Sequence, residues 1–417
     1  MFKLSGRFLF LLTFSYLTCF NALAASDSEK PLSVYGFVRS DFFYDSHVMK
    51  TSVQELYSLY PVPSAINAYG DDLNAVPSAG LNSITTRIGL ILKGKGLLGA
   101  SSSLSVIETD FGGAPNNWLL RLRQAYSQLF FSSSELLIGQ TWHPMSTASM
   151  APVVLSLNTG APFQPFNRSP QIRWDKHLGH WTLTTAGIWQ MMYASPGPDG
   201  SSFKYQRNAI LPNLYVGAEW QSAGWKTGLG YDFKRIQPQR YELDNGGVQV
   251  VSRHYLSSSS VMAYAQYAQP EWSIRFKAIQ GQNLSDHNLI SGYALTTDNT
   301  CVNYNTFSSF VNLTVGTTHQ GGFFAGYTTN QGPSSDLTPG SRFFGTGVDA
   351  ENTSNEQIIK HLYRLSPSYV FNAGAWRVGV ELEFMQALWS TRQANGHLGN
   401  TTPSSNQRVY AQLMYRF

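Results

Sequence analysis

The sequence predicts an all-β fold, a single transmembrane antiparallel β-barrel of about 16 strands with short periplasmic turns and long extracellular loops. Three observations support this prediction: the C-terminal segment alternates between two faces, the chain begins with an export signal, and it is rich in aromatic but poor in charged residues. Together they describe an exported chain whose strands face lipid on one side and water on the other.

The C-terminal segment, residues 407–417, repeats with a period of two. Phe417, Tyr415 and Leu413 fall on one face, and Arg416, Met414 and Gln412 lie between them. A strand with this period can face two media, one oily and one wet. A strand of a soluble sandwich is the alternative, although such a strand rarely ends on an exposed aromatic residue.

The N-terminal segment has the features of a secretory signal peptide. Lys3 and Arg7 precede the apolar run 8–17, and small residues lead to Ala24. Such a run is too short to span a membrane as a helix, and its layout is typical of a cleaved signal. We therefore expect residues 1–24 to be the signal peptide and residues 25–417 to form the barrel.

Composition excludes several classes of protein. Charged residues make up 13% of the chain, aromatic residues 14%, and the formal net charge is +4, which becomes 4 − 2 = +2 without the signal. A charge this close to zero predicts no nucleic-acid partner. No apolar run of roughly 18 residues follows the signal, which excludes helical membrane spans. In lipid, a closed barrel is the sheet that pairs all of its backbone groups.

Short turns and long polar loops divide the chain into hairpins. The short turns are expected at 94–96, 132–134, 178–180, 222–224, 269–271, 316–318 and 372–374. The long loops are expected at 46–82, 111–118, 142–169, 192–210, 237–252, 283–303, 330–358 and 390–406. Seven turns and eight loops give 16 strands in one domain, although poor alternation in two segments leaves 18 strands open.

Alternation also assigns faces to the strands. In the segment 376–384, Trp376, Val378 and Val380 are expected to face lipid, and Arg377 and Glu381 the lumen. An Arg or Lys facing lipid at mid-bilayer costs about 2–4 kcal/mol, so the charged face must turn inward. Five tryptophans beside short turns suggest an interfacial aromatic girdle, with core tryptophans as the alternative. They are Trp181, Trp220, Trp225, Trp272 and Trp376.

Several motifs, in order, resemble the general trimeric outer-membrane porin superfamily. They are Thr-Thr-Arg-Ile-Gly-Leu-Ile-Leu-Lys-Gly at 85–94, Leu-Arg-Leu-Arg-Gln-Ala-Tyr at 120–126, and Leu-Ile-Gly-Gln-Thr-Trp at 137–142. The last two, with Ser-Pro-Gln-Ile-Arg-Trp at 169–174, look closest to the DcaP-like porins.

The resemblance implies a porin in the outer membrane of a Gram-negative bacterium that lets small hydrophilic solutes diffuse passively. It also implies contact with outer-membrane lipid and lipopolysaccharide, and assembly as a homotrimer. Gln124 and Gln128, read as part of an otherwise lipid-facing stripe, hint at a face covered by another protomer.

In such porins, basic residues of the strand walls face a third loop that folds inward. Carried over by position, Arg87 and Arg123 match the wall arginines, and alternation places Arg121 beside Arg123. The expected pore-lining and constriction residues are Arg39, Arg87, Arg121, Arg123, Arg168 and Arg173. As an alternative, these arginines form ordinary lumen salt bridges with Asp41, Glu108 or Asp110, although a salt-bridged arginine can still line a pore.

The expected third loop, near 142–169, carries no acid: residues 136–174 contain neither Asp nor Glu. Its prolines and apolar residues predict that it packs inside the barrel and constricts the pore. Arginines facing an acid-free loop create a positive field in a narrow passage, which favours anions such as small carboxylates.

Other functions remain as alternatives. A substrate-specific outer-membrane channel is one, and a surface adhesion or structural barrel with a plugged lumen is another. A hydrolase built on His143 with Ser146 or Ser149 lacks a third partner, so no catalytic residue is expected. The histidines show no metal-ligand spacing, so neither a metal site nor a cofactor is expected.

Overall fold

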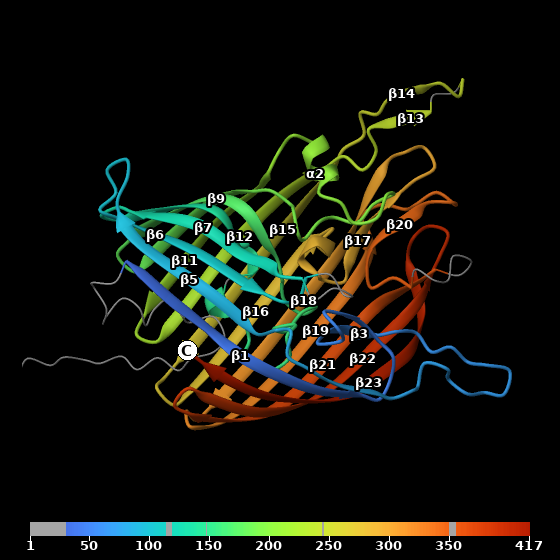
Figure 1. Ribbon diagram of the computed structural model, residues 1–417. Helices are drawn as coiled ribbons and strands as arrows, with labels where there is room; N and C mark the ends of the chain where they lie inside the picture. The colour runs from blue at the N-terminus through green and yellow to red at the C-terminus, as the bar shows by residue number, and fades with distance from the viewer. Residues whose placement is uncertain (1–30, 114–118, 147, 244–245, 350–355) are drawn as a thin grey trace, which may run out of the picture.

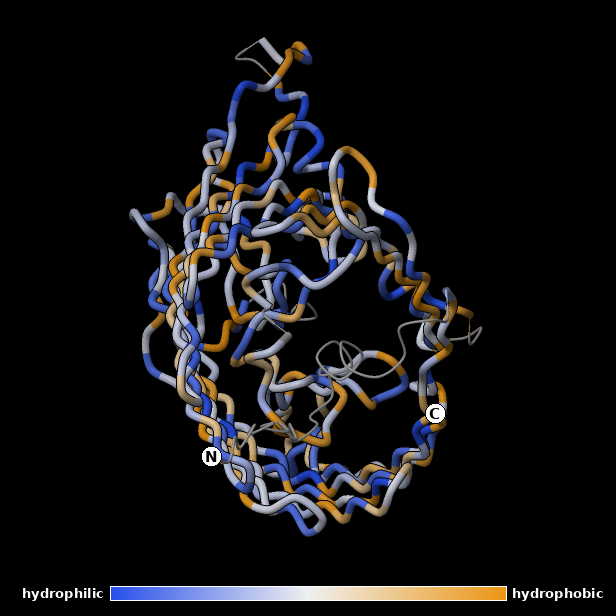
Figure 2. Tube along the Cα trace, turned by 90° about the vertical axis from the view of Figure 1, so that its left-hand side faces the viewer, coloured by the Kyte–Doolittle hydropathy of each residue, from blue (hydrophilic) through white to orange (hydrophobic). Residues whose placement is uncertain are grey.

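Alternating strands close into an antiparallel barrel, seen from the side in Figure 1 and turned by 90° in Figure 2. This computed structural model describes residues 31–113, 119–146, 148–243, 246–349 and 356–417, so the expected signal peptide lies outside the described residues. The barrel has 16 strands, which confirms the expected number. They are β1 (Leu32–Asp45), β5 (Arg87–Lys95), β6 (Ser102–Asp110), β7 (Arg121–Phe130), β8 (Ser134–Trp142), β9 (Arg168–Leu178), β10 (Trp181–Ile188), β11 (Asn213–Ser222), β12 (Trp225–Ile236), β15 (Leu256–Ala268), β16 (Trp272–Gln282), β18 (Cys301–Val315), β19 (His319–Pro333), β21 (Gln357–Ala373), β22 (Trp376–Arg392) and β23 (Leu398–Arg416).

The first and last strands close the barrel. β1 pairs with β23 from Phe37 opposite Arg416 to Asp45 opposite Arg408. At the end of this seam next to the C-terminus, the Gly36 and Phe417 backbones exchange hydrogen bonds of 3.0 and 3.1 Å. A sheet closed in this way has no free edge, so its backbone groups are paired within the protein.

The two ends of the barrel differ, with short turns near the C-terminus and long loops at the opposite end (Figure 1). Two expected boundaries were wrong. The first turn is at 96–101 rather than 94–96, because the reversal occurs where Leu98 and Gly99 adopt positive φ. The last loop shrinks from 390–406 to 393–397, because β22 and β23 remain paired at Ser390 and Thr401. Polar strands can extend a hairpin once they leave the lipid.

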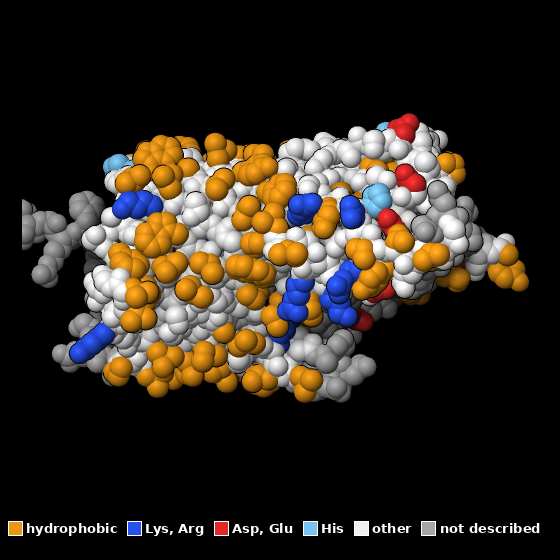
Figure 3. Space-filling model, turned by 90° about the horizontal axis from the view of Figure 1, so that it is seen from above, with side chains coloured by type: hydrophobic (Ala, Val, Ile, Leu, Met, Phe, Trp, Pro, Cys, Tyr) orange, Lys and Arg blue, Asp and Glu red, His pale blue; other side chains and the backbone are white. Residues whose placement is uncertain are grey.

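The wall has an apolar outside and a polar inside, as alternation predicted. Val378 and Val380 are exposed, whereas Arg377, Glu381 and Glu383 are buried in the interior. Figure 3 shows apolar side chains distributed over the outer wall. Trp181, Trp225, Trp272 and Trp376 are exposed at strand ends beside short turns. Within the described residues, no helix is both long and apolar enough to cross a membrane.

A β-bulge in β7 changes the face assigned to two glutamines. Gln124 lies opposite Glu108 and Leu122 opposite Thr109, which leaves Arg123 as the extra residue. The bulge turns Gln124 and Gln128 toward the interior, where both are buried and Gln124 accepts a 2.7 Å hydrogen bond from Thr141. The expectation that these glutamines lie on the outer stripe was therefore wrong, and they say nothing about a neighbouring protomer.

Shorter elements belong to the loops. They are β2 (Met49–Ser52), β3 (Tyr57–Pro61), β4 (Ser78–Asn82), η1 (Pro144–Ser146), η2 (Ala148–Met150), α2 (Lys204–Asn208), β13 (Tyr241–Leu243), β14 (Gln249–Val251), η3 (Ser285–His287), β17 (Ser291–Leu295) and β20 (Arg342–Thr346). The connection between β8 and β9, residues 143–167 and here called loop 3, folds inside the barrel. Its Val154 and Phe163 pack against Phe310, Phe324 and Trp389 of the wall.

Hydrogen bonds hold loop 3 against one side of the wall, where β23 lies between β22 and β1. The Leu155 N–H donates to Glu381 Oε2 of β22 at 2.5 Å, and the Leu155 carbonyl accepts from Arg39 Nη2 of β1 at 3.0 Å. Arg364 pairs with Glu381 and Glu383 at 2.6 and 2.8 Å, with all three side chains buried. Loop 3 is thus fixed to the wall by a buried ion-pair network rather than by apolar packing alone.

Introducing a charge on the lipid face should destabilise the barrel according to its depth. Val315 is the last residue of β18, and Val311 lies four residues before it; both side chains are exposed. We expect Val311→Arg to lower the free energy of unfolding by about 2–4 kcal/mol and the matched Val315→Arg by about 0–1 kcal/mol. Denaturant titrations in lipid vesicles measure both, and equal losses would contradict an outward-facing Val311.

Removing the acid that anchors loop 3 should destabilise the folded barrel. Glu381→Leu leaves the Leu155 N–H without this acceptor and takes one of two carboxylates from Arg364. Breaking a buried ion pair lowers the free energy of unfolding by roughly 3–5 kcal/mol. We expect a loss near the lower end of this range, because Glu383 still pairs with Arg364. The control Glu219→Gln breaks the part-exposed pair with Lys226 at 3.7 Å and should cost about 0–1 kcal/mol. Similar losses in the two variants would show that the network does not hold loop 3.

Candidate functional site

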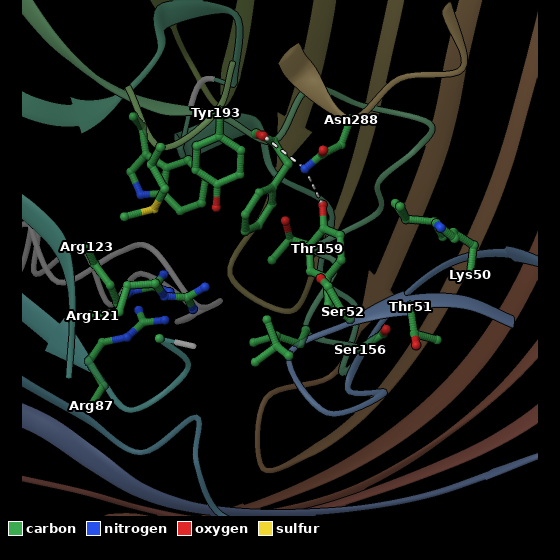
Figure 4. Close-up of a pocket in the computed structure, with 18 of the residues that line it drawn as sticks. Lys50, Thr51, Ser52, Arg87, Arg121, Arg123, Ser156, Thr159, Tyr193 and Asn288 are labelled. Atoms are coloured by element: carbon green, nitrogen blue, oxygen red, sulfur yellow. Dashed lines mark hydrogen bonds between the residues drawn. The ribbon is translucent and has the colours of Figure 1, made fainter. Parts of the chain in front are cut away.

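A cavity of about 470 Å³ lies inside the barrel between the wall formed by β1, β5 and β7 and the loops that fold inward. Figure 4 shows Arg87, Arg121 and Arg123 on one side and Lys50 on the other. The lining residues come from seven separate stretches of the chain. They are Arg39, Lys50, Thr51, Ser52, Val53, Tyr57, Leu59, Arg87, Gly113, Arg121, Arg123, Trp142, Ser156, Leu157, Thr159, Phe166, Met192, Tyr193 and Asn288.

The wall arginines are held by carboxylates of the neighbouring strand β6. Arg121 binds Asp110 at 2.8 Å, and Arg123 binds Asp110 at 2.7 Å and Glu108 at 2.9 Å. Arg87 lies farther from Glu108, at 3.6 Å. Alternation along β7 places Arg121 and Arg123 on the same interior face beside β6, and the bulge after Arg123 turns Gln124 inward as well. These are the salt bridges considered as the alternative reading, and the same guanidinium groups also border the cavity.

The charges around the cavity do not balance. Its described lining includes five basic residues and neither Asp nor Glu. Asp110 and Glu108 face three guanidinium groups, and the fourth arginine, Arg39, pairs with Asp41 at 2.6 Å. One positive charge of the cluster therefore exceeds its carboxylate partners, and the guanidinium groups rather than the carboxylates face the open space.

Arg168 lies next to the cavity, behind aromatic residues. Its guanidinium group is 4.8, 5.2 and 5.4 Å from the ring centres of Trp142, Phe166 and Tyr193, and it donates a 2.8 Å hydrogen bond to the Tyr193 hydroxyl. Arginine over aromatic faces is a favourable cation–π arrangement. Arg168 is fully buried and is not part of the lining, but its three aromatic neighbours are.

Arg173 lies apart from the other expected residues. It is on β9, pairs with Asp175 at 2.9 Å, and does not contribute to the cavity lining. The structure therefore brings Arg39, Arg87, Arg121 and Arg123 together, places Arg168 behind the lining, and leaves Arg173 elsewhere. 

Lys50, Tyr193 and Asn288 also line the cavity and were not among the expected residues. Each belongs to a loop whose inward fold depends on tertiary contacts: Asn288, for example, donates a 3.0 Å hydrogen bond to Tyr57 of β3. The connection between β1 and β5, residues 46–86, is here called loop 1; its β2–β3 hairpin carries Lys50 inward. In the sequence, these loops differ from simple connections between strands only by their greater length, and length alone could have marked them as functional.

The histidine–serine pair considered for hydrolysis is not assembled. The Ser146 hydroxyl hydrogen-bonds with the Asn167 backbone, and the His143 ring accepts from the Met145 N–H and faces Asp232. A nucleophile needs a base within hydrogen-bond reach, and Ser146 has a different partner.

No protein-family model and no curated protein sequence matched the chain. Solved structures do match its fold. The outer membrane channel DcaP of Acinetobacter baumannii has a TM-score of 0.66 and 17% identity, with 93% of this chain and 97% of that chain covered.

Two further structures have lower scores. The outer membrane protein OmpT of Vibrio cholerae has a TM-score of 0.55 and 9% identity, covering 93% of this chain and 97% of its own. OmpF of Salmonella typhi, solved in complex with daunomycin, has a TM-score of 0.52 and 11% identity, with the same two coverages of 93% and 97%. The chain therefore has the fold of porin-like outer-membrane barrels, and its apolar outer wall fits the outer membrane of a Gram-negative bacterium.

Proposed function

We propose that this protein is an outer-membrane porin through which small hydrophilic solutes diffuse passively, with a preference for anions and carboxylates. One observation supports the anion preference above all: five basic side chains border the described part of the cavity lining and no acidic ones do. Loop 3, fixed between β1 and β22, is the proposed constriction. The proposed pore residues are Arg39, Arg87, Arg121 and Arg123 on the wall, Lys50 opposite them, and Arg168 behind the aromatic lining. Arg173, which was also expected to line the pore, lies outside this cavity.

The field of the cluster is strong enough to select ions. A guanidinium group roughly 6 Å from a permeating ion in a wet pore contributes about 0.7 kcal/mol. This corresponds to about threefold in the local concentration of an anion, and to a similar factor in the opposite direction for a cation. Apolar walls focus such fields further, and salt screens them.

We infer that the partners are outer-membrane lipid, lipopolysaccharide and two further copies of the chain. Support for the homotrimer comes from the fold, since one matching structure is described as the trimer form of OmpT from Vibrio cholerae, with a TM-score of 0.54. We assign no enzymatic activity to the chain.

A substrate-specific channel for small carboxylates is the second candidate. Trp142, Phe166 and Tyr193 give the cavity an apolar side next to the arginines. A carboxylate with an apolar part could contact both. Such a channel would show saturable conductance with carboxylate salts, whereas a general porin would not.

Neutralising two wall arginines should shift selectivity toward cations. For the double variant Arg87→Gln, Arg123→Gln we expect the anion-to-cation permeability ratio to fall by at least about tenfold at low salt, because each charge attracts an anion and repels a cation by ~0.7 kcal/mol. The reversal potential in a planar bilayer under a salt gradient measures the ratio. An unchanged reversal potential would contradict the anion-selective site.

Two variants serve as controls for this experiment. Arg173→Gln removes a guanidinium group outside the cavity lining and should leave the reversal potential unchanged. Lys50→Gln removes a cavity charge on loop 1 while leaving the arginine–carboxylate pairs intact, so it separates the effect of charge from that of disrupted pairing. A folded wild-type barrel without conductance would instead favour a plugged adhesion barrel.

A further inference from the structure

Three residues far apart in the sequence meet at the start of loop 3. His143 begins loop 3, Asp232 points inward from β12, and His287 ends η3 in the loop after β16. One potential ligand atom from each lies within 4.8 Å of the other two. The spacing of these residues along the chain gives no sign of the cluster, because each comes from a different segment.

The cluster is buried and its polar atoms lack partners. All three residues are at least nine-tenths buried. His143 Nε2, Asp232 Oδ2 and His287 Nδ1 are each buried without a hydrogen-bond partner. The Nε2–Oδ2 distance between His143 and Asp232 is 3.5 Å, and the two imidazole rings are perpendicular, with centres 4.6 Å apart. Buried polar atoms normally have partners, so three convergent atoms without them suggest a missing ligand.

The charges near the cluster also suit a cation. Lys234 pairs with Asp286 at 2.6 Å, so these two charges compensate each other. Among the described residues, the ion-pair neighbour of Asp232 is His143 at 3.5 Å rather than a lysine or an arginine. A bound cation would therefore give this buried carboxylate the partner of opposite charge that a buried ion needs.

We propose that His143, Asp232 and His287 bind one divalent ion of the zinc class inside the barrel. Two imidazoles and one carboxylate are donors that Zn²⁺ accepts, with a fourth position open to water. The ion would join loop 3, the loop after β16 that contains η3, and the β12 wall. This proposal does not depend on the anion preference, because the cluster shares no residue with the cavity lining.

One hydrogen bond opposes metal binding. The Met145 N–H donates to His143 Nδ1 at 3.1 Å, so in the metal-free chain the ring proton resides on Nε2. Coordination through Nε2 moves this proton to Nδ1 and breaks the bond to Met145. Binding therefore includes a small shift of η1, which the experiment below allows for by titrating the folded protein with metal.

The test uses purified, folded protein that is stripped with a chelator, titrated with Zn²⁺ and dialysed to remove unbound metal. We expect one Zn²⁺ per chain by elemental analysis, and Co²⁺ substitution to give ligand-field absorption bands that an aqueous ion lacks. Asp232→Asn and His287→Ala should each weaken binding at least about tenfold. His177→Gln is the matched control, because His177 also faces a carboxylate, Glu135, at 3.1 Å but has no third ligand.

Three results would overturn the proposal: substoichiometric Zn²⁺ in the wild type, Co²⁺ bands like those of the aqueous ion, or undiminished binding in both variants. In each case a proton, rather than a metal, occupies the space between His143 and Asp232. The wild-type measurements stand even if a variant fails to fold, and heat-modifiable migration on gels identifies the folded barrels. Retained conductance selectivity after metal removal would separate this site from the anion-selective one.

Discussion

Lipid on the outside of the barrel is the constraint on which the rest of the structure depends. Because lipid offers no hydrogen bonds, the sheet must close, and β1 does so against β23 through the last residue, Phe417. Because lipid excludes charge, each strand turns its charged face inward, as β22 does with Arg377 and Glu381. The interior therefore collects the charge of the whole wall, and its chemistry follows from how completely these charges are paired.

Two places in the interior have a charged group without a full set of ion-pair partners; the excess charge is positive at one and negative at the other. Beside β7, three guanidinium groups share Glu108 and Asp110, which leaves positive charge facing an open cavity. Beside β12, the Lys234–Asp286 pair leaves the carboxyl group of Asp232 beside the imidazoles of His143 and His287 in a closed space. An open cavity would let a mobile anion compensate the first excess, whereas the closed space suits the resident cation that we propose. The same imbalance thus predicts passage at one site and fixed binding at the other.

Alternation in the sequence was sufficient for the features that depend on one strand at a time. It predicted the number of strands and the faces of β22 and β23, because the period of two is read directly along the chain. It failed at Gln124, where the extra residue Arg123 shifts the period, and at 390–406, where polar residues extend a hairpin beyond the lipid. The arginines were found because they share strand walls, but Lys50 and the histidine cluster depend on loops that only tertiary contacts position.

Loop 3 determines which part of the interior stays open. Leu155 donates its N–H to Glu381 and accepts at its carbonyl from Arg39, so one residue of loop 3 is fixed to both strands that flank β23. Apolar packing of Val154 and Phe163 against Phe310 and Phe324 fills the side toward β18 and β19. The carboxylates of β22 are thereby covered by loop backbone and by Arg364. What remains open faces the arginines of β5 and β7, so under the proposed function the loop favours anions by covering acidic side chains rather than by adding basic ones.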